Sequence, residues 1–235
     1  MGSRSLYIGG SAMSTASKQT IEKGRELASD ALEAAGQDIE YRDGRFKVAG
    51  TDLGIGLFEL AAKQPQKRIA ITTLQKVDGP SWPNSCHVCE VEIDPETGVT
   101  QIVRYTTVDD VGRVINPLIV AGQVHGGIAQ AVGQALLENA HYDPESGQLV
   151  TGSLLDYCLP RADDLPNFNT FTDETTPCKI NPLGAKGVGE LGTVGGTPTV
   201  MNAVIDALRP LGVKQIEMPA TPEKVWRAIN QAKAA

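Results

Sequence analysis

Several patterns are scarce in this sequence, and each scarcity excludes a class of protein. Only three histidines occur in 235 residues, and no Ser-His-Asp order is legible among them, which argues against a triad hydrolase. No apolar run approaches the ~20 residues needed to cross a bilayer. Lys and Arg number 21 against 28 Asp and Glu and do not cluster, so neither nucleic acid nor a membrane surface is an expected partner.

Cysteine is also scarce, with four unevenly spaced residues, and the N-terminus lacks the basic-then-apolar pattern of a signal peptide. We therefore expect a cytoplasmic protein without a disulfide scaffold. Cys86 and Cys89 suggest a zinc site at first, but on a strand they would point to opposite faces and no second pair completes a tetrahedron. We expect all four cysteines to be small buried hydrophobic residues.

Glycine and proline, by contrast, are abundant, with 25 and 14 residues gathered in particular segments, which indicates long, shaped loops. Apolar periodicity and turn residues predict the elements. Helices are expected at 14–35, 53–63, 119–139, 197–208 and 221–232, hairpins at 39–48, 87–108 and 142–155, and strands at 68–77 and near 171. Because helices and strands do not strictly alternate, the predicted class is α+β with mostly antiparallel sheets. We expect one region, 1–235, with a subdivision near residue 80 into 1–80 and 81–235.

The segment Gly187-Val188-Gly189-Glu190-Leu191-Gly192 formally matches the dinucleotide fingerprint G-x-G-x-x-G. A dinucleotide site needs a strand directly before the motif, and residues 181–186 have the composition of a loop. It also needs a helix that begins within the motif, whereas Thr197-Pro198 is the expected helix start. A nucleotide-binding oxidoreductase through Gly187–Gly192 is therefore only an alternative.

Glu190 can be interpreted in two ways from its neighbours. Flanking glycines let a ligand approach the backbone, because glycine has no Cβ, and desolvation there would make the carboxylate a competent base. An exposed loop glutamate would have the same local sequence, so both interpretations stay open.

Gln123 and Gln130 are seven residues apart, which places their amides on nearly the same helix face together with Gly126 and Gly127. Paired amides suit a ligand rich in donors and acceptors, such as a pterin or a phosphate, although two surface glutamines would show the same spacing. His125 is expected to be a loop or packing residue, as is His141.

A family resemblance runs through the whole chain in one consistent order. It is carried by residues 2–5, 89–98, 109–117, 122–130, 181–190, 202–208 and 218–223. These segments resemble the C-terminal part of the molybdopterin-binding large subunit of the xanthine oxidase family, in its carbon monoxide dehydrogenase-like branch. The fold implied is the C-terminal half of a molybdenum cofactor-binding domain. The run Gly195-Gly196-Thr197-Pro198 departs from the apolar Ala-Pro-Pro sequence expected there.

The resemblance also implies a chemistry. Such enzymes oxidise a C–H carbon of an N-heteroaromatic, purine or aldehyde substrate with water, and Glu190 falls on the glutamate that acts as the base activating a molybdenum-bound hydroxide. Gln130 matches a glutamine that hydrogen-bonds the pterin. The remaining implied cofactor-binding residues are Gly2, Ser3, Arg4, Ser5, Gly187, Val188 and Gly189. No residue is implied as a metal ligand.

The implied cofactor is molybdenum–molybdopterin, with the cytosine dinucleotide form as one option, while FAD and 2Fe-2S clusters reside on partner subunits. The family's large subunits have a long N-terminal half that this sequence does not contain. The expected partners are that half, the 2Fe-2S subunit, the FAD subunit and a small-molecule substrate, with a homodimer as a further option. We expect a fragment or split subunit that is inactive alone; the alternative is a non-catalytic, cofactor-free domain that needs a partner chain.

Overall fold

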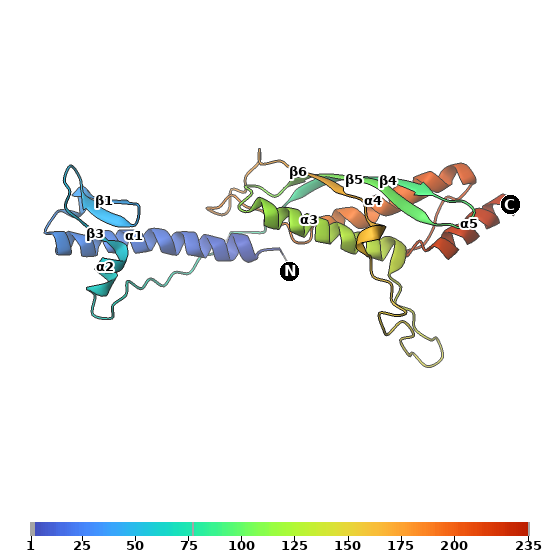
Figure 1. Ribbon diagram of the computed structural model, residues 1–235, viewed down its shortest axis with the longest axis horizontal. Helices are drawn as coiled ribbons and strands as arrows, with labels where there is room; N and C mark the ends of the chain where they lie inside the picture. The colour runs from blue at the N-terminus through green and yellow to red at the C-terminus, as the bar shows by residue number, and fades with distance from the viewer. Residues whose placement is uncertain (1–2, 77, 235) are drawn as a thin grey trace. The chain divides into compact units, whose positions relative to one another are not determined.

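The computed structural model describes residues 3–76 and 78–234, and the chain divides into two compact units. The larger unit consists of Met1–Arg4, Pro80–Lys179 and Gly184–Ala235. The smaller unit consists of Ser5–Gly79 and Ile180–Leu183. Each unit has its own hydrophobic core, so each is described by itself (Figure 1).

The smaller unit combines two helices with a three-stranded antiparallel sheet. A π-helical turn, η1 (Leu6–Gly10), leads into α1 (Ser11–Leu32), and η2 (Gly36–Asp38) precedes the sheet of β1 (Ile39–Arg42), β2 (Arg45–Val48) and β3 (Gly54–Gly56). Helix α2 (Leu57–Ala62) follows β3 directly. The core consists of Ala28, Ile39, Phe46, Ile55 and Leu60. The Phe46 ring packs so closely on α1 that a Cβ at Gly24 would lie 2.3 Å from its Cζ atom.

The larger unit is a three-stranded sheet packed against helices. Strands β4 (Asn84–Ile93) and β5 (Thr100–Asp110) form a long antiparallel hairpin, and β6 (Phe168–Thr172) pairs with β5 in parallel. Helix α3 (Pro117–Val132) continues into the π-helical turn η3 (Gly133–Leu137), and η4 (Ala162–Asp164) precedes β6. Helix α4 (Leu191–Leu208), the turn η5 (Arg209–Leu211) and α5 (Pro222–Ala234) complete the unit.

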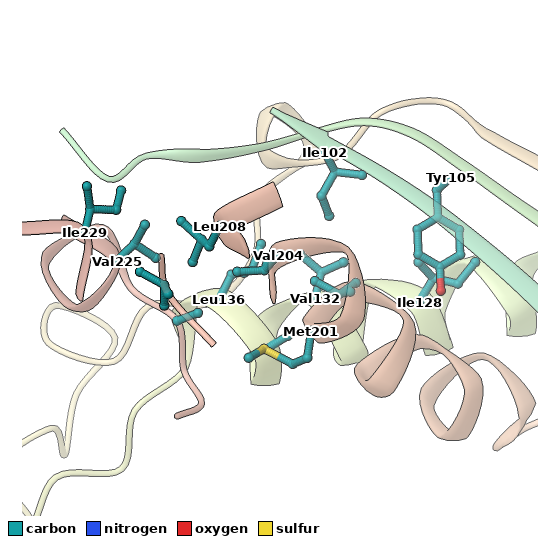
Figure 2. Close-up of a cluster of buried hydrophobic side chains, with 14 of the residues drawn as sticks. Ile102, Tyr105, Ile128, Val132, Leu136, Met201, Val204, Leu208, Val225 and Ile229 are labelled. Carbon is teal, nitrogen blue, oxygen red and sulfur yellow. The ribbon is translucent and has the colours of Figure 1, made fainter. Parts of the chain in front are cut away.

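Helices α3 and α4 lie side by side under the sheet and supply most of the core (Figures 1 and 2). Ten of its side chains come from β5, α3, η3, α4 and α5: Ile102, Tyr105, Ile128, Val132, Leu136, Met201, Val204, Leu208, Val225 and Ile229. Burial of this apolar area is the main stabilising contribution to the larger unit.

The α+β class is confirmed, as are most of the expected elements. The helices expected at 14–35, 119–139 and 221–232 are present, as are the hairpins at 39–48 and 87–108 and the strand near residue 171. The hairpin expected at 142–155 is present only in its first part: Tyr142 and Leu149 form an antiparallel bridge and the Val150 N–H donates to the His141 carbonyl oxygen, but residues 151–155 form no strand.

Three further expectations need correction. The helix expected at 53–63 begins only at Leu57, because Gly54–Gly56 first pairs with β2. Residues 68–76 form no strand, since they pair with no other strand of the described chain. Helix α4 begins at Leu191 instead of Thr197, and Pro198 lies inside it. A proline there is tolerated because it removes only the bond to the carbonyl of Val194, on the exposed side of the helix.

The cysteines differ partly from expectation. Cys86 and Cys158 are exposed and Cys89 and Cys178 are half-buried, so the expected burial of all four is wrong. Along β4 exposure alternates, which places Cys86 and Cys89 on opposite faces as predicted. Burial raises the pKa of the Cys89 thiol to about 12. In the described residues no group of three or more His, Cys, Asp and Glu is arranged to hold a metal ion, and no helix is long and apolar enough to cross a bilayer.

Candidate functional site

The site begins with an unusually close contact between α3 and α4. A Cβ added to Gly127 would lie 2.8 Å from the Cα of Gly192, and one added to Gly192 would lie 2.6 Å from the Val124 carbonyl oxygen. Leu191, the first residue of α4, is buried in a small cluster with Val111 and Val120. The glycines and this cluster together fix the start of α4 against α3.

Glu190 is the N-cap residue of α4 and its side chain is exposed. The Ser3 hydroxyl donates to Glu190 Oε2 at 2.9 Å and accepts from the Glu190 backbone N–H at 3.0 Å. A single serine therefore holds both the main chain and the carboxylate. The expected loop position of Glu190 is corrected to a helix N-terminus. The expected desolvation is not provided by the described residues of this chain, which leave the carboxylate exposed.

The two glycines before Glu190 lie against the same serine. A Cβ at Gly187 would lie 2.5 Å from the Ser3 carbonyl oxygen, so only glycine fits there. A Cβ at Gly189 would lie 3.1 Å from Gln123 Oε1 and 3.2 Å from Ser3 Oγ. The structure thus brings together a carboxylate, a hydroxyl, a side-chain amide and two glycine backbones from three distant parts of the sequence.

Gln130 lies farther along α3 and pairs with α4. Its Oε1 accepts from Thr193 Oγ1 at 3.0 Å, and one turn later Gln134 Oε1 accepts from Thr197 Oγ1 at 3.2 Å. In each pair the amide NH2 remains free to donate. Sequence reasoning missed both threonines because it began the helix at residue 197. The matching four-residue spacings of 130/134 and 193/197 would have indicated them.

The other predicted site residues have varied positions. Gly2 lies outside the described residues, Arg4 is exposed, and Ser5 belongs to the smaller unit. Val188 is half-buried and packs on the hydrophobic clusters of the larger unit. Of residues 2–5, Ser3 is the one whose contact with Glu190 is described.

The structure bears on the dinucleotide alternative in two ways. Helix α4 begins inside the G-x-G-x-x-G match, against expectation, but residues 181–186 form no strand before it. Asp206 lies within α4. A strand–loop–helix unit is therefore absent around the motif in the described chain.

A buried polar group beneath α4 was also missed from the sequence. His87 Nδ1 lies 2.8 Å from the Tyr105 hydroxyl, and a Cβ at Gly195 would lie 2.9 Å from His87 Nε2. Burial raises the pKa of the Tyr105 hydroxyl well above its ordinary value. Gly195, in the run that departs from the expected sequence, therefore makes room for the His87 ring under α4.

Asp109 is buried beside this histidine. Burial alone would raise the pKa of its carboxyl, but attraction by His87 and hydrogen bonds from the Ser85 and Thr107 hydroxyls more than offset it. The pKa of Asp109 is therefore lowered. His87 Nε2 itself stays 3.6 Å from the Asp109 carboxylate, beyond hydrogen-bonding reach. Of these residues, His87 and Tyr105 lie against Gly195 and Gly196 of α4, and all of them belong to strands β4 and β5.

Comparison with known proteins identifies the family. Residues 1–166 match the molybdopterin cofactor-binding domain, and the chain belongs to that family, which confirms the resemblance found in the sequence. It is 37% identical to the 6-hydroxypseudooxynicotine dehydrogenase complex subunit gamma of Paenarthrobacter nicotinovorans over 242 residues, covering 98% of this chain and 30% of that protein. It is 35% identical to the carbon monoxide dehydrogenase large chain of Hydrogenophaga pseudoflava, covering 98% of this chain and 29% of that one.

The structure agrees with these relationships. It matches the crystal structure of quinoline 2-oxidoreductase from Pseudomonas putida 86 with a TM-score of 0.84 at 37% identity, covering 99% of this chain and 31% of that chain. The chain thus spans about 30% of the length of the curated relatives it matches. Glu190 lies beyond the family match at residues 1–166 but within the region shared with these relatives, which covers nearly all of the chain.

Proposed function

We propose that this chain supplies the base-bearing part of a molybdenum hydroxylase, with Glu190 as the base. The observation that carries the proposal is the arrangement of the Glu190 carboxylate at the start of α4. Ser3 holds Oε2, while the side chain as a whole is exposed, so Oε1 is free to accept a proton. A carboxylate restrained at one oxygen and open at the other is suited to general-base catalysis.

The residues around Glu190 fit a pterin cofactor. Gly187 and Gly189 let Ser3 and Gln123 lie directly against the main chain, so a hydroxyl and an amide are gathered beside Glu190 as possible hydrogen-bonding groups for the pterin. Gln123 and Gln130 offer amide groups along α3; Gln123 lies against Gly189, the residue before Glu190, and Gln130 against Thr193. We therefore add Gln123 to the proposed cofactor-binding residues. When bound, molybdenum–molybdopterin supplies the redox change and polarises water.

The proposed reaction is hydroxylation of an electrophilic C–H carbon in an N-heteroaromatic, purine or aldehyde, with the oxygen taken from water. In this scheme Glu190 Oε1 takes the proton as the oxygen becomes nucleophilic, and Ser3 keeps the carboxylate oriented. Electrons would then leave through 2Fe-2S and FAD groups on partner subunits.

The 235-residue chain alone is expected to be inactive, because it spans only about 30% of the length of the related large chains. Large apolar side chains are exposed at the starts of both site helices, namely Leu118 and Ile119 on α3 and Val194 on α4. Exposed large apolar side chains on these helices favour a protein partner that covers them. The proposed partners are the remaining part of the large subunit and the iron–sulfur and flavin subunits.

The test is Glu190→Gln in the assembled enzyme, with Glu96→Gln, in the exposed turn between β4 and β5, as the matched control. Quinoline, hypoxanthine and benzaldehyde serve as probe substrates, with reduction of an electron-accepting dye as the readout. We expect turnover per bound molybdenum to fall by about 10²- to 10⁴-fold in Glu190→Gln and to stay unchanged in the control.

The same experiment can refute the proposal. Near-normal turnover in Glu190→Gln would show that the base lies elsewhere. An assembled enzyme that contains nicotinamide nucleotide and no molybdenum would favour the dinucleotide alternative instead.

A further inference from the structure

The loop that leads to Glu190 is attached to the end of β5 by main-chain hydrogen bonds. Gly112 and Ala185 form an antiparallel bridge, and the Arg113 N–H donates to the Gly184 carbonyl oxygen at 2.9 Å. The Lys186 N–H donates to the Val111 carbonyl oxygen at 2.7 Å. The loop therefore runs beside the strand end for three residues before it turns towards α4.

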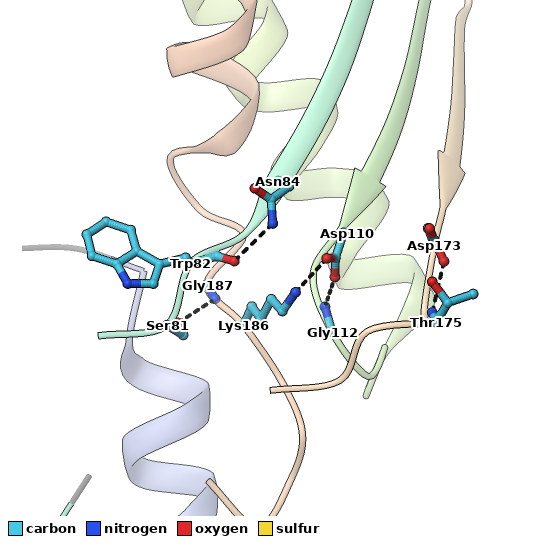
Figure 3. A network of polar contacts seen from close by, with 9 residues as sticks. All are labelled: Ser81, Trp82, Asn84, Asp110, Gly112, Asp173, Thr175, Lys186 and Gly187. Atoms are coloured by element: carbon cyan, nitrogen blue, oxygen red, sulfur yellow. Dashed lines mark hydrogen bonds and ion pairs between the residues drawn. The ribbon is translucent and has the colours of Figure 1, made fainter. Parts of the chain in front are cut away.

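A buried ion pair joins the same two segments through side chains. Lys186 Nζ lies 2.5 Å from Asp110 Oδ2, and their side chains are only 8% and 16% exposed. The other carboxylate oxygen, Oδ1, accepts from the Gly112 N–H at 2.9 Å. Both oxygens of Asp110 are thus engaged, which fixes the direction from which Lys186 approaches (Figure 3).

Stability alone is a poor explanation for this pair. The desolvation of two buried charges offsets much of their attraction, and well-packed apolar residues are often at least as stable. The pair does, however, impose a direction and a register on the loop. Its position, four residues before Glu190 in the sequence, makes that register matter for the carboxylate.

Of the three residues between Lys186 and Glu190, only Val188 has a side chain beyond hydrogen. Gly187 has no side chain, and its N–H donates to Ser81 Oγ at 3.2 Å. Gly189 likewise contributes only backbone, while Val188 packs into the core. A shift at residue 186 would therefore be passed along the backbone to Glu190.

We propose that Lys186 and Asp110 form a positioning pair that sets the place of the Glu190 carboxylate, an inference that rests on the proposed role of Glu190. Neither residue is a catalytic residue, since both act through the loop. The pair fixes the loop against the end of β5, and the loop in turn sets the position of the proposed base at the start of α4.

The test compares removal of the whole pair with removal of an exposed one. Lys186→Met with Asp110→Leu eliminates both charges and leaves neither partner buried alone, which avoids the folding penalty of single substitutions. The matched control is Arg104→Met with Glu90→Leu, because this pair joins the same hairpin at 3.2 Å but is 63% and 50% exposed. Lys186→Arg with Asp110 intact serves as the charge-conserving rescue.

Two measurements are made on each variant. In the assembled enzyme, with the fastest of the three probe substrates, we expect kcat per bound molybdenum to fall roughly 10- to 100-fold while KM stays within about threefold, because a misplaced base loses rate more than binding. In the 235-residue chain alone, hydrogen exchange of the amides at 187–191 should accelerate. The control should change neither measurement, and Lys186→Arg should recover part of both.

The outcomes separate the two proposals. If Glu190→Gln abolishes turnover but the double variant keeps normal kcat per molybdenum and normal exchange, the positioning pair is wrong and the role of Glu190 stands. If the double variant loses only molybdenum content and thermal stability, with kcat per molybdenum unchanged, the pair is purely structural and the inference is overturned. If Glu190→Gln keeps normal turnover, both proposals fall together.

Discussion

Substituting alanine for Gly127 tests the helix contact that fixes the start of α4. In an ordinary helix this change stabilises by about 0.8–1 kcal/mol, because alanine has the higher helix propensity. Here the new Cβ would lie 2.8 Å from the Cα of Gly192 and 2.9 Å from the N of Thr193. Both are backbone atoms, so relief requires α4 to move, and overpacking of this kind costs about 1–3 kcal/mol. We expect a net loss of about 1–2 kcal/mol.

The neighbouring residue provides a control on the same helix. A Cβ added to Gly126 would meet no atom within 4 Å, and the residue is exposed. Gly126→Ala should therefore show only the propensity gain of up to about 1 kcal/mol. The two adjacent substitutions are predicted to change the free energy of unfolding in opposite directions, with a spread of about 2–3 kcal/mol.

Urea unfolding followed by tryptophan fluorescence measures this spread. Both tryptophans, Trp82 and Trp226, belong to the larger unit, so the signal reports on the unit that contains the helix contact. A spread of this size separates the two unfolding midpoints by about 1 M urea. A Gly127→Ala midpoint equal to or above that of Gly126→Ala would refute the claim that α3 and α4 meet through their backbones.

Two further predictions use the same unfolding assay. Gly98 has a positive φ of 75°, and a Cβ there would lie 2.0 Å from the Pro222 carbonyl oxygen, whereas Gly147, with φ of 70°, has nothing within 4 Å. Gly147→Ala should cost only the left-handed strain of about 1–2 kcal/mol, and Gly98→Ala clearly more, since it also displaces α5; equal losses would contradict the packing. Asp109 has a pKa below its unfolded value of about 3.9, so its stabilisation is fully present above that pH and is lost as the pH falls through the folded pKa. Asp109→Asn should remove this part of the stability loss below about pH 4. If the free energy of unfolding of the variant still falls with pH as steeply as that of the unsubstituted chain, Asp109 does not contribute this stabilisation.

The features predicted well from the sequence are those determined locally. The hairpin of β4 and β5 follows from alternating side chains and from a turn in which Asp94 accepts hydrogen bonds from the Glu96 N–H and the Thr97 hydroxyl. These hydrogen bonds lower the pKa of Asp94. Helix α5 was likewise predicted from its Thr-Pro-Glu start and from an apolar face of Val225, Trp226 and Ile229, of which Val225 and Ile229 are buried while Trp226 is exposed. Such signals need no knowledge of the remaining chain.

The start of α4 could not be predicted because it is a tertiary feature. Locally, Thr197-Pro198 is the best helix start in the segment. The helix begins six residues earlier because Leu191 is buried with Val111 and Val120 and because Gly192 fits against α3. Burial and backbone contact there outweigh the unfavourable proline.

The candidate site divides in the same way. The family resemblance named Glu190 as the base, and that assignment stays a prediction. The contact with Ser3 joins residues 187 apart in the sequence, so no spacing rule could find it. The helical spacing predicted Gln123 and Gln130 on one face, but their different neighbours, Gly189 just before α4 and Thr193 within it, follow only from the packing of α4 against α3.

The role of glycine near the site differs from what composition indicates. Glycine-rich stretches predict shaped loops, yet Gly187 and Gly192 are glycine because another backbone occupies the space of their Cβ atoms. The position of Glu190 is consequently determined by main-chain contacts on both sides of it. Because these contacts join backbone atoms, a side chain added at either glycine would displace them. The carboxylate and the Gln123 amide are thereby presented on a rigid backbone, which is what the proposed base and the proposed cofactor donor require to act at a fixed distance from a bound ligand.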